Sequence, residues 1–243
     1  MSSFIDSFNP EIICLQETKV QDLEFPREFF DERGYNIAIW GQKTFNGVAI
    51  LSKRPFESLS KGLTGQENEQ ARWIEAYIPS EKCGVLRVCS LYLPNGNPCP
   101  GEKYDYKLHW MEAMRIYVQG MLDEEIPIIL AGDYNVIPTH RDAARPEKIM
   151  NDATFILPTR QAYGRILSQG WVDAYRVLYP ESESYTFWDY KGQAWAQNFG
   201  LGIDMMLLSP QAADLLQDSG IEKEERDREK PSDHVPVWCT LDA

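Results

Sequence analysis

The chain of 243 residues has 24 Lys and Arg against 37 Asp and Glu, which gives a formal net charge of −13 at pH 7. This balance argues against a general polyanion-binding surface. The net charge does not exclude a local basic groove, or a site where clustered carboxylates hold a divalent metal. The hydrophobic fraction of 43% is enough for one large core. No stretch approaches the roughly 18 consecutive apolar residues of a transmembrane helix.

The N-terminus and the cysteines favour a cytoplasmic protein that has no membrane partner. The first ten residues contain Asp6, Asn9 and Pro10 and no basic region, so they do not resemble a signal peptide. The five cysteines are odd in number, lie mostly in apolar runs and have no CxxC spacing. We therefore expect buried, reduced thiols rather than disulfides or a zinc site.

Strand-like and loop-like segments alternate along the chain, with no repeats and no low-complexity linker. Before Pro10, the residues Phe4, Ile5 and Phe8 are typical of the last turns of an amphipathic helix. Period-two and short apolar runs predict strands from Ile12 onward and at 35–40, 48–52, 72–78, 85–93, 128–131, 203–209 and 235–241. Helices are predicted at 107–124, 158–169 and 210–218. This mixture favours a layered α/β fold with mixed sheets. The segment 222–230, EKEERDREK, predicts a solvated loop or helical surface with no functional signal.

Polar side chains recur where the predicted strands begin or end. The apolar run IICL ends in Gln16 and Glu17, and the run IILA passes through Gly132 to Asp133. Polar residues also stand at the boundaries of other predicted strands. The whole set of polar boundary residues comprises Glu17, Tyr92, Asn95, Asp133, Asn135, Asp204, Asp233 and His234. Near a core, unpaired groups of this kind are costly. If the boundaries converge, the carboxylates need a cation, hydrogen bonds or a shared proton.

Each of these residues also has a plainer interpretation when it is taken alone. An Asp after Gly is usually a turn residue, and a single His is more often a structural hydrogen-bonding group than a base. An Asp–His pair also occurs in serine hydrolases, but the chain has no Gly-x-Ser-x-Gly elbow to supply a nucleophile. A purely structural ion pair between Asp204 and His234 stays an open alternative. The inference therefore depends on the whole set and its order.

Eight stretches, in order along the chain, resemble the exonuclease III family of the endonuclease/exonuclease/phosphatase superfamily. They are LQETK (15–19), NGVAILSK (46–53), EQARWIEA (69–76), LYLPNG (91–96), GDYNV (132–136), YTFWDY (185–190), IDMMLLS (203–209) and KPSDHVPVW (230–238). The resemblance implies a DNase I-like, four-layer α/β sandwich with two packed mixed β-sheets flanked by helices. It also implies a Mg²⁺-dependent DNA phosphodiesterase, with Mn²⁺ as a possible substitute, that is a 3′→5′ exonuclease on double-stranded DNA and an endonuclease at abasic sites. Its expected partners are abasic sites and 3′ ends, bound by a monomer.

The resemblance assigns roles to the residues at the strand boundaries. It implies catalytic roles for Tyr92, Asp133, Asn135, Asp204 and His234. It implies metal ligands among Glu17, Asp133, Asn135, Asp233 and His234. Asp133 handles the proton of the attacking water or of the leaving group, and Asn135 orients that water. Tyr92, Asn95 and His234 contact the scissile phosphate, while Asp204 fixes the tautomer of His234. The residue types agree, because Mg²⁺ is a hard ion that prefers a few carboxylates and keeps several waters.

Substrate contacts are expected from basic and apolar residues beside the matching stretches. Phosphate-backbone contacts are predicted for Lys43 and Arg72, with Lys19, Lys103 and Lys107 as further candidates. Phe187, Leu201 and Ile203 match the place where the family forms an apolar pocket for a sugar that lacks its base. For any single cation the alternative is a solvated surface, and for the apolar residues it is the core. For Trp188 the core is the favoured interpretation.

Three departures from the family pattern shape the remaining expectations. The family's first strand, with a Trp-Asn pair, is not found, Gly202 stands where Arg is usual, and Leu201 where Trp is frequent; Met205 also replaces a common ring. We expect a single domain over residues 1–243 that is truncated at its N-terminus and weakly active. The alternatives are a non-catalytic relative, or another phosphodiesterase, phosphatase or sphingomyelinase of the superfamily.

Overall fold

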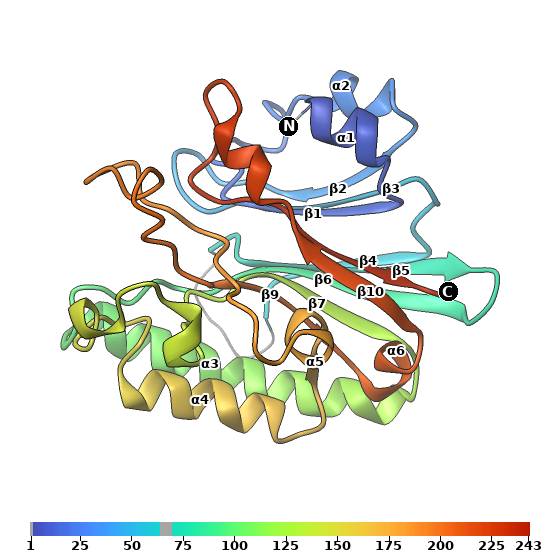
Figure 1. Cartoon of the computed structure of the whole chain (residues 1–243). Helices are drawn as coiled ribbons and strands as arrows, with labels where there is room; N and C mark the ends of the chain where they lie inside the picture. Colours follow the sequence, from blue (N-terminus) through green and yellow to red (C-terminus); the bar gives the residue numbers. More distant parts are fainter. Residues whose placement is uncertain (1, 64–69) are drawn as a thin grey trace.

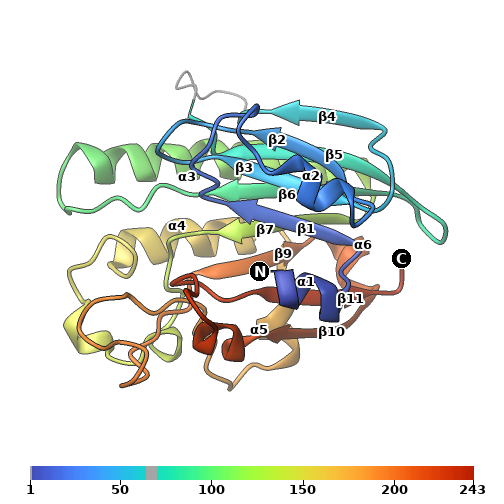
Figure 2. The same cartoon turned by 90° about the horizontal axis from the view of Figure 1, so that it is seen from above.

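Two β-sheets packed face to face form the centre of the molecule, and helices cover their outer faces (Figure 1). The computed structural model describes residues 2–63 and 70–243. Seen from above, the smaller sheet lies across the larger one, with α3 on the far side (Figure 2). The expected four-layer α/β sandwich is therefore confirmed.

The smaller sheet comes from the first part of the chain and is antiparallel, in the order β1-β3-β2. The elements of this layer are α1 (Ser2–Phe8), β1 (Ile12–Gln16), α2 (Arg27–Asp31), β2 (Asn36–Trp40) and β3 (Val48–Ser52). All five residues of β3 are buried, because the strand packs on both of its faces. Ile50 points to the larger sheet, and Leu51 contacts the residues of α1 and α2.

The larger sheet has six strands in the order β4-β5-β6-β7-β9-β8. They are β4 (Ser58–Lys61), β5 (Trp73–Ser80), β6 (Gly84–Tyr92), β7 (Ile128–Asp133), β9 (Asp204–Leu208) and β8 (Val172–Asp173). Among the described strands, only β6 and β7 pair in parallel, and α3 (Glu102–Met121) connects them. This crossover brings the carboxyl ends of β6 and β7 to the same edge of the sheet.

Apolar residues alternate along the central strands and fill two separate layers. In β7, Ile129 and Ala131 face the smaller sheet, whereas Ile128 and Leu130 pack against α3 and α4 (Leu157–Leu167). The period of two in a strand that is buried on both sides explains why its sequence is a continuous apolar run. The remaining elements are α5 (Ala174–Leu178), α6 (Pro210–Ala213), the hairpin pair β10 (Leu216–Ile221) and β11 (Val237–Leu241), and the 3₁₀ helices η1 (Leu122–Glu124), η2 (His140–Asp142), η3 (Pro146–Lys148) and η4 (Lys223–Asp227).

Most predicted strands are confirmed, and the errors have local causes. The helix predicted at 210–218 is wrong in its second half, because α6 ends at Ala213 and Leu216 begins β10. The strands β4 and β8 were not predicted, since β4 is exposed along its length and β8 has two residues. All five cysteines are free, as expected, but only Cys89 is fully buried and the other four are partly exposed. Glu69, the first residue of EQARWIEA, lies outside the described residues.

The charged segment EKEERDREK is more than a solvated surface. Most of it forms η4, but Arg226 is 7% exposed. Its guanidinium donates to the main-chain oxygen of Trp188 at 3.1 Å and lies 4.9 Å from the Tyr190 ring centroid. The predicted helical surface is confirmed for most of the segment and is wrong for Arg226, because the run of charges hides one residue whose carbon stem and planar head cover apolar surface. No helix in the described ranges has the length and apolarity to cross a membrane.

A buried ion group ties β5 to β6 at a distance from the strand ends considered below. Arg87 of β6 donates to the Glu75 carboxylate at 2.9 Å and also contacts Glu124. The Glu75 side chain is 4% exposed and accepts further hydrogen bonds from Ser60 and Tyr117. Because both charged groups are buried, removal of one partner is costly, although the pair as a whole adds little to the free energy of unfolding.

Substitution of Arg87 by Met is expected to lower the free energy of unfolding by about 3–5 kcal/mol, because it leaves the Glu75 carboxylate buried without its cation. Urea unfolding followed by circular dichroism measures this change. Arg115→Met is the control, since Arg115 pairs with Glu112 at the surface, and a loss below about 1 kcal/mol is expected there. Equal losses in the two variants would contradict the distinction between the buried and the exposed pair.

Candidate active site

The register of three neighbouring strands sets polar side chains side by side at one edge of the larger sheet. Tyr92, the last residue of β6, is the parallel partner of Asp133, the last residue of β7. Asp133 is in turn the antiparallel partner of Asp204, the first residue of β9. Gly132 allows the close approach of β6 and β7, because a Cβ there would overlap the Leu91 carbonyl oxygen. Backbone pairing thus positions these side chains before they make any contact of their own.

Asp133, Asp204 and His234 form a compact acidic cluster. Their nearest oxygen and nitrogen atoms all lie within 4.8 Å of one another. His234 reaches the cluster from the segment before β11, which pairs with Phe187 through an isolated bridge. Its Nδ1 lies 2.8 Å from Asp204 Oδ2, so that Nε2 is the ring nitrogen left for other partners.

The charges of the cluster shift the protonation of two of its members. Burial, reinforced by the neighbouring Asp204, raises the pKa of Asp133 to about 7. Burial alone would lower the pKa of His234, but the carboxylates of Asp204, Asp133 and Asp233 raise it to about 10. The imidazolium therefore balances part of the negative charge, and Asp133 can exchange a proton near neutral pH.

Glu17 enters the same region from the smaller sheet. It follows β1 with φ of 51°, a left-handed conformation that is uncommon for this residue type. Its carboxylate accepts the hydroxyl of Tyr92 and pairs with Lys19. Burial would raise the pKa of Glu17, but the contacts with Lys19 and Tyr92 outweigh it and lower the pKa. Tyr92 has a single O–H, so in this arrangement its hydroxyl orients Glu17 rather than a phosphate.

Two asparagines continue the site beyond Asp133. Asn135 has φ of 48°, which Asn tolerates better than most residues, and is 4% exposed. Its Nδ2 donates to Asp133 Oδ2 at 3.1 Å and to the Leu93 main-chain oxygen at 3.0 Å. Asn95, after β6, donates to Asn135 Oδ1 at 2.9 Å. The turn residues Asn95 and Asn135 thus join into one hydrogen-bonded row with Asp133.

The structure corrects the expectation for Lys107 and refines the one for Arg72. Lys107 is fully buried and donates to the main-chain oxygens of Asn95, at 3.0 Å, and Asn135, at 2.5 Å. It therefore is no surface cation for DNA. The signal in the sequence is its place in the apolar stripe of α3, three residues from both Tyr104 and Trp110. Arg72 stacks on the Tyr92 ring at 4.7 Å and donates to the Tyr92 main-chain oxygen, which braces that residue. Lys43 is exposed.

An apolar wall borders the cluster on the side of β9. Phe187, Leu201 and Ile203 pack with Ile137 and Phe155 in one cluster, in which Phe187 and Leu201 are only partly buried. The Phe187 ring centroid lies 5.0 Å from that of His234. Trp188 is fully buried and belongs to the core, as favoured from the sequence.

Thr186 is a residue of the site that the sequence did not single out. It is 1% exposed, and its hydroxyl oxygen accepts from the backbone amides of Ile203 and Asp204, both at 3.2 Å. Its own carbonyl accepts from Val235 at 2.8 Å. Thr186 thus joins the segments that present Asp204 and His234. A Thr among aromatic residues has no pattern that would reveal this role.

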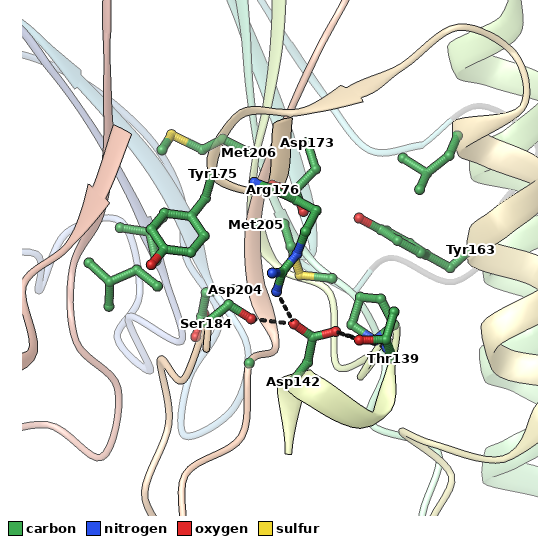
Figure 3. Close-up of a pocket in the computed structure, with 15 residues that line it drawn as sticks. Thr139, Asp142, Tyr163, Asp173, Tyr175, Arg176, Ser184, Asp204, Met205 and Met206 are labelled. Atoms are coloured by element: carbon green, nitrogen blue, oxygen red, sulfur yellow. Dashed lines mark hydrogen bonds and ion pairs between the residues drawn. The ribbon is translucent and has the colours of Figure 1, made fainter. Parts of the chain in front are cut away.

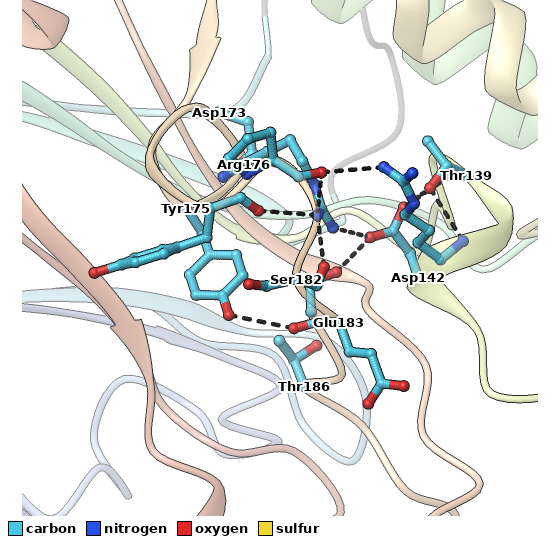
Figure 4. A network of polar contacts seen from close by, with 12 residues as sticks. Thr139, Asp142, Asp173, Tyr175, Arg176, Ser182, Glu183 and Thr186 are labelled. Carbon is cyan, nitrogen blue, oxygen red and sulfur yellow. Dashed lines mark hydrogen bonds and ion pairs between the residues drawn. The ribbon is translucent and has the colours of Figure 1, made fainter.

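A cavity of about 140 Å³ lies behind Asp204 and is lined in part by Met205, Gly202 and Arg176 (Figure 3). Gly202 and Met205 are two of the departures from the family pattern, and a Cβ at Gly202 would lie 2.5 Å from the Ser184 carbonyl oxygen. Below the cavity Asp142 pairs with Arg176 and accepts from Thr139 and Ser184 (Figure 4). The Asp142 carbonyl also accepts from the Gly202 amide at 2.7 Å. This polar network fixes the backbone just before Asp204.

The donor set suits a hard divalent cation. Asp133, Asp204 and His234 are the group that could hold a metal ion among the described residues. The carboxylate oxygens of Asp133 and Asp204 fit Mg²⁺ or Mn²⁺, whereas Nδ1 of His234 already contacts Asp204. Asp133 and Asp204 also concentrate negative charge at a buried position, which a cation would relieve. Glu17 lies close enough to contribute to the electrostatics of both Asp133 and His234.

Comparison with known proteins identifies the family. The model of the Endonuclease/Exonuclease/phosphatase family matches residues 1–234. Exodeoxyribonuclease III of Haemophilus influenzae is 33% identical over 98% of this chain and 92% of its own. The exodeoxyribonuclease of Bacillus subtilis is 32% identical over 97% and 89%.

Solved structures agree with the relatives found by sequence. An AP endonuclease from Archaeoglobus fulgidus superimposes with a TM-score of 0.94 at 35% identity, covering 100% of this chain and 93% of its own. A variant of the 3′ phosphatase NExo from Neisseria, bound to a product DNA hairpin, gives 0.94 at 32% identity and covers 99% and 92%. The chain therefore belongs to the Endonuclease/Exonuclease/phosphatase family, within its branch of exodeoxyribonucleases III and AP endonucleases.

Proposed function

We propose that the protein is a Mg²⁺-dependent DNA repair phosphodiesterase, an endonuclease at abasic sites and a 3′→5′ exonuclease on double-stranded DNA. The observation that supports this most is the cluster of Asp133, Asp204 and His234, with the hydrogen-bonded row of asparagines beside it. The curated relatives that act as exodeoxyribonucleases and AP endonucleases support the same activity. The five free thiols suit the reducing environment of the cytoplasm.

Phosphodiester hydrolysis needs a group that accepts the proton of water and groups that balance charge on the phosphate. In the proposed reaction the water oxygen bonds to phosphorus, the bond to the 3′ oxygen breaks, and that oxygen takes a proton. Asp133, at the end of β7 beside Asp204 and His234, exchanges the proton at the reacting end. His234 donates from Nε2 to a phosphate oxygen, since Asp204 holds Nδ1.

Further residues hold the metal and the substrate in this proposal. Glu17 and Asp233, together with Asp133, Asn135 and His234, would hold Mg²⁺, which would supply Lewis-acid charge to a phosphate oxygen. Asn95 is exposed and offers its amide to the phosphate. An extruded sugar without its base rests against the apolar wall of Phe187, Leu201 and Ile203. A normal nucleotide is rejected because its base is too bulky for this place.

Incubation of the protein with a duplex that contains one abasic analogue tests the activity. We expect cleavage at the abasic site in Mg²⁺, none in EDTA, and slower shortening of a recessed 3′ end. A duplex with a 3′-terminal phosphate distinguishes a phosphatase, which would release phosphate and leave the abasic strand intact. No reaction on any of the three substrates would favour a non-catalytic relative.

Asp133→Asn is expected to lower kcat by about 10²–10⁴-fold, because the amide keeps the shape of the carboxylate but cannot take up the proton. Single-turnover cleavage of the abasic duplex measures the loss, and fluorescence anisotropy in Ca²⁺ measures DNA binding, which stays intact. The control Asp218→Asn changes an exposed carboxylate on β10. Weakened DNA binding in proportion to the lost activity would contradict the catalytic role.

Glu17→Gln is expected to raise the Mg²⁺ concentration that gives half-maximal activity, since it removes a charged ligand. Tyr92→Phe should raise the same concentration by a smaller factor, because it deletes the hydroxyl that orients the Glu17 carboxylate. A Mg²⁺ titration of the initial cleavage rate compares both variants with the unaltered protein. An unchanged titration midpoint in Glu17→Gln would refute the ligand assignment.

A further inference from the structure

A row of side-chain amides runs from Asp152 to Asp133, and from Asn97 onward each amide donates to the next residue in the direction of Asp133. Asn97 Nδ2 donates to both oxygens of Asp152 at 3.1 Å and to Asn95 Oδ1 at 3.0 Å. Asn95 Nδ2 donates to Asn135 Oδ1 at 2.9 Å, and Asn135 Nδ2 donates to Asp133 Oδ2 at 3.1 Å. We call Asn97, Asn95 and Asn135 the amide row. It joins a carboxylate outside the proposed site to the proposed proton-transfer group.

The orientation of the amides in the row follows from the Asp152 carboxylate at its end. Carboxylate oxygens only accept, so Asn97 must present its NH₂ group to Asp152. The Ala153 backbone amide donates to Asn97 Oδ1 at 3.1 Å, which fixes the same orientation independently. Asn95 must then present its oxygen to Asn97, whose backbone amide also donates to that oxygen at 3.2 Å. The NH₂ group of Asn95 is thereby turned toward Asn135 and the open side of the site.

Asp152 and the backbone of the row are held firmly enough to enforce this order. Thr154 donates to Asp152 Oδ1 through its backbone amide at 2.8 Å and through its hydroxyl at 2.6 Å. On the other side, the buried Lys107 binds the main-chain oxygens of Asn95 and Asn135. A Cβ at Gly96 would lie 2.7 Å from Lys107 Cδ, so the turn closes tightly over the lysine. The side chains are free only to flip, and Asp152 favours the same orientation as the backbone amides of Ala153 and Asn97.

We propose that Asp152 and Asn97 are positioning residues for phosphodiester cleavage, which fix the orientation of the Asn95 amide that faces the phosphate. This inference rests on the proposed function above. Asp152 touches neither metal nor substrate, and acts through Asn97 and Asn95. Hydrogen bonds in a chain polarise one another, so the same order also strengthens the bond from Asn135 to Asp133.

Replacement of Asp152 by Asn weakens the hold on Asn97 at the end of the row while it conserves size. Thr154 still needs an acceptor, which keeps the new side-chain oxygen on its side and turns the new NH₂ group toward the NH₂ of Asn97. Asn97 then keeps only one of its two acceptors on residue 152, the oxygen that Thr154 also binds, so its side chain is held less firmly against Asn95. We expect kcat on the abasic duplex to fall about tenfold with KM unchanged, as for one lost hydrogen bond in the transition state.

A double-mutant cycle separates positioning from general stability. In the background of Asn95→Ala, Asp152→Asn should cause no further loss of kcat, because its effect passes through Asn95. The matched control is Asp218→Asn, since Asp218 also accepts from a backbone amide and a hydroxyl, of Ser219 and Tyr179, and faces no amide row. This control should leave kcat unchanged. Multiplicative losses in the double mutant would overturn the inference.

Side-chain amide signals in ¹⁵N–¹H NMR spectra test the row without turnover. In the metal-free protein, Asp152→Asn should shift the signals of Asn95 and Asn135, and Asp218→Asn should leave them in place. Unchanged signals in Asp152→Asn overturn the inference even if the enzyme is active. If the unaltered protein fails to cleave DNA but the signals shift, the proposed function fails while the ordering of the row by Asp152 is upheld, and its catalytic purpose is refuted.

Discussion

The pairing of Asp133 with Asp204 across β7 and β9 is the constraint on which the rest of the site depends. Two carboxylates at neighbouring strand ends, one of them buried, repel each other in a medium that screens poorly. Each further feature offsets that cost. His234 supplies a positive charge, Asn135 supplies donors to Asp133, and the donor set as a whole suits a cation. Geometry that is expensive without ligand is the arrangement expected of a site evolved to hold one.

The strands that present the site could be predicted from the sequence because their patterns are strong. The continuous apolar run of β7 and the alternation in β5 both follow from burial, and Gly132 and Asp133 end the first of them recognisably. Strands such as β4 and β8, by contrast, owe their conformation to a neighbour rather than to their own residues. The same reason explains the missed half of the 210–218 segment, which forms a strand because β11 lies beside it.

The site itself was predictable as a set of residues and not as a set of partners. Polar residues at strand ends mark where chemistry can occur, but the sequence does not state which hydroxyl meets which carboxylate. Tyr92 was expected to face the phosphate, and the sequence did not indicate that its hydroxyl also contacts Glu17. Lys107 was a candidate surface cation, and it lies under the asparagines. Such pairings depend on side-chain directions between distant segments, which only the assembled fold determines.

The contacts of the Lys and Arg side chains in the site affect how an acidic protein would bind DNA. Lys19 pairs with Glu17, Arg72 stacks on Tyr92 and Lys107 is buried, so these positive charges already have partners within the protein. Each phosphate neutralised by a protein cation adds to the salt dependence of binding. A site whose nearest cations are committed elsewhere would instead rely on the bound metal and on hydrogen bonds from neutral groups. In the proposed function the Asn95 amide would serve that purpose, because it offers a donor to a phosphate without adding to the charge that high salt screens.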